Sequence, residues 1–292
     1  MTVCISALAA QERAIVCMAD KALTYGALIQ WDSDSSKMFS LRSGGLVIMF
    51  SGSEEPTSRI LGKVIAREAE LGNDIAATKG MLESEYQAAV QEIVEAKYLT
   101  PQLMTRDEYV KAISGKTINS FIGSIAREVQ CYTPDASLIV SGFDEHEKPF
   151  ILSVDAPGIV TDMTVTGFHS IGSGWEKSIS KLLFSDFSRK DPLYTVMYDI
   201  FDAKAFAEMA AGVGADWDTR IITAHDRGIL VPENIDGLIE KGWMEQEHHP
   251  FAISPLSEDE RPPARWKAML RSYANSIVPT PKRPARKRKQ KL

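Results

Sequence analysis

The sequence has no long hydrophobic run, and this scarcity excludes a membrane-spanning protein. A helix that crosses a bilayer needs about 18 or more apolar residues with few charges, and no stretch of the 292 residues comes near that. The first twenty residues are apolar but have no basic start, and Glu12 and Arg13 interrupt them, so they do not form a signal peptide. We therefore expect a cytoplasmic protein with no membrane partner.

Cysteine and histidine are also scarce. The three cysteines, Cys4, Cys17 and Cys131, lack metal-ligand spacing, and an odd count favours reduced thiols over a disulfide framework. Cys4 and Cys17 lie in apolar, strand-like runs, where we expect buried structural thiols. The pair His248-His249 has no third His or Cys nearby, so a solvated loop pair is the simpler interpretation. We expect no metal and no cofactor.

The charge is unevenly distributed along the chain. The net charge is -6, yet the tail from Lys282 carries seven positive charges, which leaves the rest of the chain at -13. An acidic body is not typical of a nucleic-acid-binding surface. The tail could contact an anionic partner, or it could be a solvated, disordered end.

Apolar residues, which make up 44% of the chain, alternate between strand and helix patterns. The order predicted from them is strands, helices, strands, helices, strands, with helical layers outside strand-rich layers. The predicted strands cover 2–9, 13–20, 37–41, 46–50, 137–142, 149–154, 168–171 and 219–224. The predicted helices cover 57–71, 73–98, 175–187 and 193–212, and residues 104–130 contain one more helix or two. We place the core domain at 2–245, a C-terminal extension with a short helix at 246–278, and a disordered basic tail at 279–292.

Thr2 is the first residue with chemical interest. Its small side chain permits removal of Met1, and the mature chain would then begin with threonine. A free α-amino group has an unperturbed pKa of about 8, so it can act as the general base for the hydroxyl group of its own residue. Many chains begin Met-Thr, so this feature alone is a weak signal.

Four further features follow Thr2 in a fixed order. Asp20 ends the second strand and Lys37 opens the third. Gly52 follows the apolar strand 46–50, and Ser173 lies in a Gly-Ser-Gly segment between a strand and a helix. With these features the sequence resembles the proteasome β-subunit family of N-terminal-nucleophile hydrolases, over roughly residues 2 to 235. That group includes the bacterial ATP-dependent protease peptidase subunit and the ancestral β-subunit.

The resemblance implies a fold, a reaction and a role for each residue. The fold is a four-layer αββα sandwich, with two antiparallel sheets between helical layers. Thr2 Oγ would attack a carbonyl carbon while the charge of Lys37 depresses the pKa of the Thr2 groups, and Asp20 would hold Lys37 charged and oriented. The backbone N–H of Gly52 would serve the oxyanion, and Ser173 would help to relay protons. These roles imply amide hydrolysis of a peptide or protein through an acyl-enzyme. The resemblance also implies a homo-oligomeric ring that encloses the site.

Each of these residues also has a structural interpretation. Asp20 and Lys37 could form a surface ion pair of small energetic value. Ser173 could be only a helix N-cap, and Gly52 only a turn former.

One segment departs from the family pattern. Active members usually carry Asp-x-x-Ser-Gly before the strand that corresponds to 219–224, whereas residues 208–218 contain Gly212 and Gly214 but lack that Asp and Ser. This stretch is closer to the Val-Gly variant of the ancestral β-subunit. Because of this departure, a catalytically inactive proteasome-like assembly or binding protein stays open as an alternative function. The basic tail leaves a second alternative, an adaptor that binds its partner through this tail.

Overall fold

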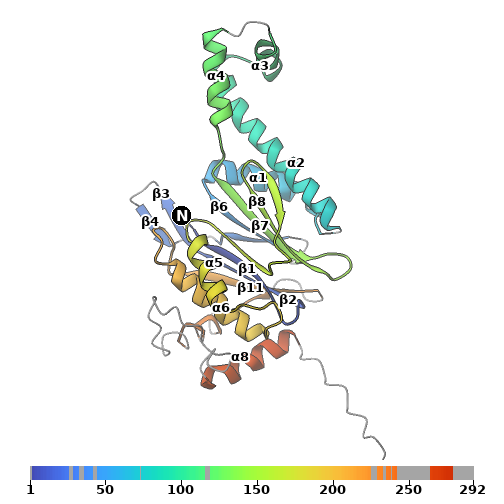
Figure 1. The fold of residues 1–292 in the computed structure, drawn as a ribbon, viewed down its shortest axis with the longest axis vertical. Helices are drawn as coiled ribbons and strands as arrows, with labels where there is room; N and C mark the ends of the chain where they lie inside the picture. The colour runs from blue at the N-terminus through green and yellow to red at the C-terminus, as the bar shows by residue number, and fades with distance from the viewer. Residues whose placement is uncertain are drawn as a thin grey trace, which may run out of the picture.

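Two antiparallel sheets lie face to face between layers of helices in a computed structural model of the chain (Figure 1). The structure describes residues 2–25, 29–32, 36–41, 45–72, 74–115, 119–224, 229–232, 235–237, 239–241 and 264–278. The expected domain boundary at 245, the pair His248-His249 and the basic tail 279–292 lie outside the described residues.

The first sheet contains the N-terminal strands. Its order is β10-β1-β2-β11-β12, and every neighbouring pair is antiparallel. The strands are β10 (Phe168–Ile171), β1 (Cys4–Ala9), β2 (Ala14–Asp20), β11 (Trp217–Thr223) and β12 (Ile229–Leu230). All residues of β1 and β2 are buried, because the second sheet covers one face and helices cover the other.

The second sheet has the order β5-β6-β7-β8-β9 and is also antiparallel. Its strands are β5 (Met38–Leu41), β6 (Leu46–Gly52), β7 (Ala136–Phe143), β8 (Pro149–Asp155) and β9 (Ile159–Asp162). A separate hairpin pairs β3 (Ala22–Tyr25) with β4 (Ile29–Asp32). The sequence did not predict β9, because this edge strand has no buried residue to produce an apolar pattern.

Helices cover the outer face of each sheet. α1 (Glu54–Ala66) and α2 (Ile75–Val94) pack on the second sheet, while α5 (Trp175–Phe184) and α6 (Leu193–Ala207) pack on the first. α8 (Ala264–Ile277) adds a further layer: Leu270 and Ala274 join the apolar cluster that contains α6. α3 (Arg106–Ile113) and α4 (Ser120–Cys131) project beyond the sandwich at the far end of α2 (Figure 1).

The space between the sheets is filled by small and medium apolar side chains, among them Cys4, Cys17 and Ile139. Both thiols are fully buried, as expected, and burial raises the pKa of Cys17 to about 12. The predicted αββα sandwich with two antiparallel sheets is confirmed. Among the described residues, no helix combines the length and the apolar character that a bilayer crossing requires.

Candidate active site

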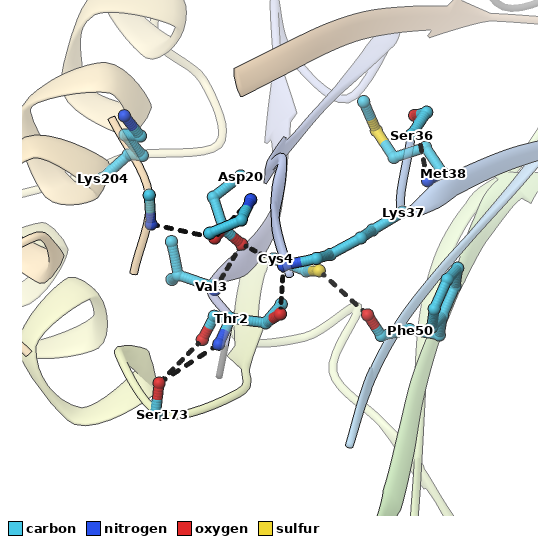
Figure 2. A network of polar contacts seen from close by, with 12 residues as sticks. Thr2, Val3, Cys4, Asp20, Ser36, Lys37, Met38, Phe50, Ser173 and Lys204 are labelled. Atoms are coloured by element: carbon cyan, nitrogen blue, oxygen red, sulfur yellow. Dashed lines mark hydrogen bonds and ion pairs between the residues drawn. The ribbon is translucent and has the colours of Figure 1, made fainter. Parts of the chain in front are cut away.

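The structure brings Thr2, Asp20 and Lys37 together at one end of the two sheets. Thr2 lies two residues before β1, Asp20 is the last residue of β2, and Lys37 directly precedes β5 of the other sheet. β1 and β2 are neighbours in register, so the start of one strand lies beside the end of the other. Lys37 then crosses from the second sheet to reach this corner (Figure 2).

Asp20 is completely buried, and its carboxylate receives hydrogen bonds on both oxygens. Oδ1 accepts from the backbone N–H of Val3 at 2.9 Å and from Lys37 Nζ at 3.0 Å. Oδ2 accepts from the N–H of Gly214 at 3.0 Å and of Ala22 at 3.3 Å. Four donors compensate the cost of burying this charge.

Lys37 connects the carboxylate to the candidate nucleophile. Its ammonium group donates both to Asp20 Oδ1 and to Thr2 Oγ1. The side chains of Lys37 and Asp20 are only 5% and 0% exposed, so the interpretation of a surface ion pair is wrong. A buried cation within hydrogen-bond distance of a threonine hydroxyl stabilises negative charge on that oxygen.

Ser173 reaches Thr2 from the opposite side, between β10 and α5. Its hydroxyl oxygen accepts from the backbone nitrogen of Thr2 at 3.1 Å, and the hydroxyl lies 3.4 Å from Thr2 O (Figure 2). The same hydroxyl lies 3.5 Å from Ala211 O. The N-cap of α5 is Gly174, and Ser173 makes no capping bond. The N-cap interpretation of Ser173 is therefore wrong, and its side chain belongs to the Thr2 cluster.

Gly172 and Gly174 allow the backbone of Thr2 to approach this segment. Gly172 has φ +93°, and a Cβ atom there would lie 2.2 Å from Thr2 O. The N–H of Gly174 donates to the same carbonyl at 3.2 Å. The Gly-Ser-Gly sequence thus has a geometric reason: Gly172 has no room for a Cβ beside Thr2 O, a Cβ at Gly174 would lie 3.0 Å from Ala207 Cβ and from Val213 Cγ2, and the serine between them meets the Thr2 nitrogen.

Gly52 is not brought into hydrogen-bond contact with Thr2 in the part of the chain that the structure describes. It ends β6 opposite Ala136, and its φ of +116° places the missing Cβ 2.2 Å from Asp135 O. The fold itself therefore requires glycine here, in agreement with the turn-former interpretation. The end of β6 does lie beside the cluster, because Phe50 O accepts from Cys4 Sγ at 3.4 Å.

The sequence marked residues 208–218 as a departure from the family pattern but did not predict that residues 208–216, which we call the 208–216 loop, contact the Thr2 cluster. It supplies the Gly214 N–H to Asp20 and the Ala211 carbonyl near Ser173. Lys204 on α6 holds this loop through Ala215 O and was not singled out. The pair Gly212 and Gly214 was a visible signal of a close backbone approach, but its partner Asp20 could be found only in three dimensions.

Two other kinds of chemistry have little support at this corner. Burial raises the pKa of the Cys4 thiol, with a smaller contribution from the charge of Asp20, so a reactive thiolate is disfavoured. Within the described ranges, no group of three or more His, Cys, Asp or Glu side chains is arranged to hold a metal ion.

Comparisons with known proteins place this fold. No family model matches the chain, and no curated protein matches it in sequence. Anbu (ancestral beta-subunit) from Yersinia bercovieri superposes with a TM-score of 0.55 at 14% identity, over 84% of this chain and 93% of that one. An Anbu (Gly-1) mutant from Hyphomicrobium sp. strain MC1 gives 0.53 at 16% identity, over 84% and 94%.

A third solved structure is eukaryotic HslV from Trypanosoma brucei, with 18% identity over 76% of this chain and 99% of that one. Its TM-score of 0.46 is too low to support an argument. The two Anbu structures suffice: the chain has the αββα fold of proteasome-like N-terminal-nucleophile hydrolases. At these identities the likeness extends to the fold and not to activity.

Proposed function

We propose that the chain is a threonine-type peptidase or amide hydrolase whose nucleophile is Thr2, exposed by removal of Met1. The observation that carries this proposal is the buried bridge in which Lys37 Nζ donates to both Thr2 Oγ1 and Asp20 Oδ1. A buried lysine held by a carboxylate and directed at a hydroxyl is the arrangement that an activated oxygen nucleophile needs.

The first half-reaction forms the acyl-enzyme. Thr2 Oγ bonds to the substrate carbonyl carbon, its proton passes to the free α-amine of the same residue, and the carbonyl π electrons move to the oxygen. Collapse of this tetrahedral intermediate breaks the C–N bond, and the leaving amine takes the proton back from the α-ammonium group. Lys37 donates to Thr2 Oγ1 and stabilises the negative charge that develops on this oxygen during attack.

The second half-reaction releases the product. A water molecule loses a proton to the α-amine and attacks the ester carbonyl, and the C–O bond to Thr2 then breaks with return of the proton to Oγ. Ser173 is suited to orient the amine, because its hydroxyl oxygen already accepts from the Thr2 nitrogen at 3.1 Å. The Gly52 N–H at the end of β6 remains our proposed donor to the oxyanion.

The test compares three forms of the full chain on peptide substrates. Wild type should hydrolyse them and Thr2→Ala should not, with a loss of about 10³-fold or more. Thr2→Ser keeps a hydroxyl and an α-amine, so it should retain measurable hydrolysis. Equal turnover by wild type and Thr2→Ala would refute the proposal.

A peptide or protein substrate and a homo-oligomeric ring belong to the same proposal. A ring would shelter a hydrolytic site from folded proteins. Sedimentation velocity measures the oligomeric state, and a single species with the mass of one chain would contradict the ring.

A second candidate is a catalytically inactive proteasome-like assembly or binding protein. The 208–216 loop favours it, since this stretch lacks the Asp and Ser that active members usually carry. It predicts that Thr2→Ala leaves assembly and function unchanged. Loss of a hydrolytic activity on that substitution would exclude it.

An anionic partner for the tail from Lys282 stays a separate prediction, tested by salt-sensitive binding that disappears when the tail is deleted.

A further inference from the structure

Lys204 is a completely buried lysine in the last turn of α6. Its ammonium group donates to the backbone carbonyl of Ala215 and to Glu208 Oε1 at 2.5 Å, and it lies 4.5 Å from the centre of the Trp217 ring. A lysine is almost never fully buried unless it is paired. Carbonyl, carboxylate and aromatic ring together stabilise its charge.

These contacts span the 208–216 loop. Glu208 opens the loop at the end of α6, Ala215 lies near its other end, and Trp217 begins β11. One ammonium group therefore joins both ends of the loop and fixes its curvature. A neutral side chain of the same length could not make these bonds.

The loop in turn reaches both sides of the Thr2 cluster. The Gly214 N–H, one residue before Ala215, donates to Asp20 Oδ2 at 3.0 Å. The carbonyl of Ala211 lies 3.5 Å from Ser173 Oγ. Lys37, which directly precedes β5, contacts Asp20 itself (Figure 2), whereas Lys204 on α6 bonds to Ala215, the neighbour of the Gly214 that contacts Asp20.

We propose that Lys204 is a positioning residue, which holds the 208–216 loop so that Gly214 orients Asp20 and Ala211 orients Ser173. This inference rests on the proposed function of Thr2 and deepens it. It gives a physical reason for the departure noted in the sequence. The loop lacks the Asp-x-x-Ser-Gly pattern of the resembled family, and a lysine from the preceding helix bonds to Glu208 and Ala215 near its two ends.

The experiment compares Lys204→Met with Lys181→Met in the full chain. Methionine keeps the length of the buried side chain and removes the charge. Lys181 on α5 is a matched control, because its 3.0 Å ion pair with Asp202 joins α5 to α6 without touching the loop. Hydrogen exchange of segment 208–216, the kcat and KM of peptide hydrolysis, and the rate of covalent labelling at Thr2 are measured for each protein.

Lys204→Met should exchange its 208–216 amides at least about tenfold faster than wild type, because the loop loses its anchor. Its kcat and its rate of labelling should fall about tenfold to 100-fold while KM changes little, since the loop contacts Asp20 and Ser173 rather than the substrate. Lys181→Met should leave the exchange of this segment and kcat near wild type.

Unchanged exchange and unchanged kcat in folded Lys204→Met would overturn the inference, and so would equal effects of both variants. If Lys204→Met does not fold, Lys204→Gln, which keeps a donor but no charge, is measured in the same way with the same two outcomes. A wild type that neither hydrolyses peptides nor labels at Thr2 refutes the proposed function instead. The exchange measurement then still decides whether Lys204 holds the loop.

Discussion

The two halves of the candidate site are built in different ways. The strand half contains Thr2, Asp20 and Lys37, which lie at or next to the ends of strands in the two sheets. The loop half contains Ser173 and the 208–216 loop, which lie between elements and depend on close backbone approaches and on Lys204. In sequence, the strand half and the Gly-Ser-Gly segment around Ser173 resemble the family pattern, whereas the 208–216 loop departs from it.

This difference has a physical basis. Strand ends are positioned by ladder hydrogen bonds and by a fully buried core, so their side chains tolerate little movement. A loop can adopt one shape with several sequences, provided that some group fixes its ends. We therefore expect substitutions in the strand half to cost more than those in the loop half.

The largest effect should come from Lys37→Met. This change leaves the Asp20 carboxylate buried without its cation, which costs about 3–5 kcal/mol of unfolding free energy. Labelling of Thr2 should fall about 10³-fold or more, because the hydroxyl loses the ammonium group that donates to it. Urea unfolding and adduct formation measure the two effects.

The control for Lys37→Met is Lys79→Met, which breaks the partly exposed 3.1 Å ion pair with Asp162. It should cost less than about 1 kcal/mol and leave labelling unchanged. Equal stability losses in the two variants would contradict the strand half as described.

Gly172→Ala should give the next largest effect. At φ +93°, a Cβ atom would lie 2.2 Å from Thr2 O, so the backbone must move. We expect a stability loss of about 2 kcal/mol or more, together with loss of Thr2 labelling. Gly62→Ala on α1, where a Cβ meets nothing within 4 Å, should be neutral or stabilising by up to about 1 kcal/mol. A neutral Gly172→Ala would show that Thr2 and the Gly-Ser-Gly segment are not in close contact.

Ser173→Ala should have a smaller effect, confined to chemistry. It removes the acceptor for the Thr2 nitrogen without opening a large cavity, so stability should change by less than about 1 kcal/mol. We expect kcat to fall about tenfold to 100-fold with little change in KM. Thermal unfolding and steady-state kinetics measure both quantities. A stability loss as large as that of Lys37→Met would contradict the division into two halves.

The smallest effect on activity is expected at Asp236, whose carboxyl group lies near Thr219 and Trp217 of β11 and outside the Thr2 cluster, so that only stability should change. Burial raises its pKa to about 7. In the unfolded chain the pKa of an aspartate is about 3.9. Between about pH 3.9 and about pH 7 the folded chain therefore binds the Asp236 proton more tightly than the unfolded chain does. The free energy of unfolding falls as the pH rises through this range, and it levels off above about pH 8.

Asp236→Asn removes this titration. The variant should be about 1–2 kcal/mol more stable than wild type at pH 8, and the difference should shrink toward pH 5. Urea unfolding at both pH values measures it, with the exposed Asp186→Asn as control. A variant that is less stable than wild type at pH 8, by a deficit that shrinks toward pH 5, would show instead that the fold stabilises the anionic form of this carboxyl.

Much of the fold follows from sequence patterns alone. Apolar runs such as 46–50 predict buried strands. Thr2, Asp20 and Lys37 could be singled out because their order along these runs resembles the proteasome β-subunit pattern. The strand β9 escaped because an exposed edge strand has no apolar signature. Buried strands and helices were thus more predictable from the sequence than an exposed edge strand.

The loop half could be predicted only in part. A lysine within a helical stretch normally reaches solvent, and nothing in residues 193–212 shows that Lys204 is covered. Its burial follows from Trp217 and Ala215, which come after a turn whose shape the sequence does not determine. The contact between Gly214 and Asp20 joins residues 194 positions apart, and such a pair is found only when the sheet is assembled.

The most direct test of the central claim is mass spectrometry of the purified chain before and after treatment with a peptide epoxyketone, which reacts with a hydroxyl and an α-amine on the same N-terminal residue. Our account predicts that Met1 is absent, that one inhibitor adds per chain, and that the adduct maps to Thr2 and is missing in Thr2→Ala. Retention of Met1, or an adduct that persists in Thr2→Ala, would contradict it.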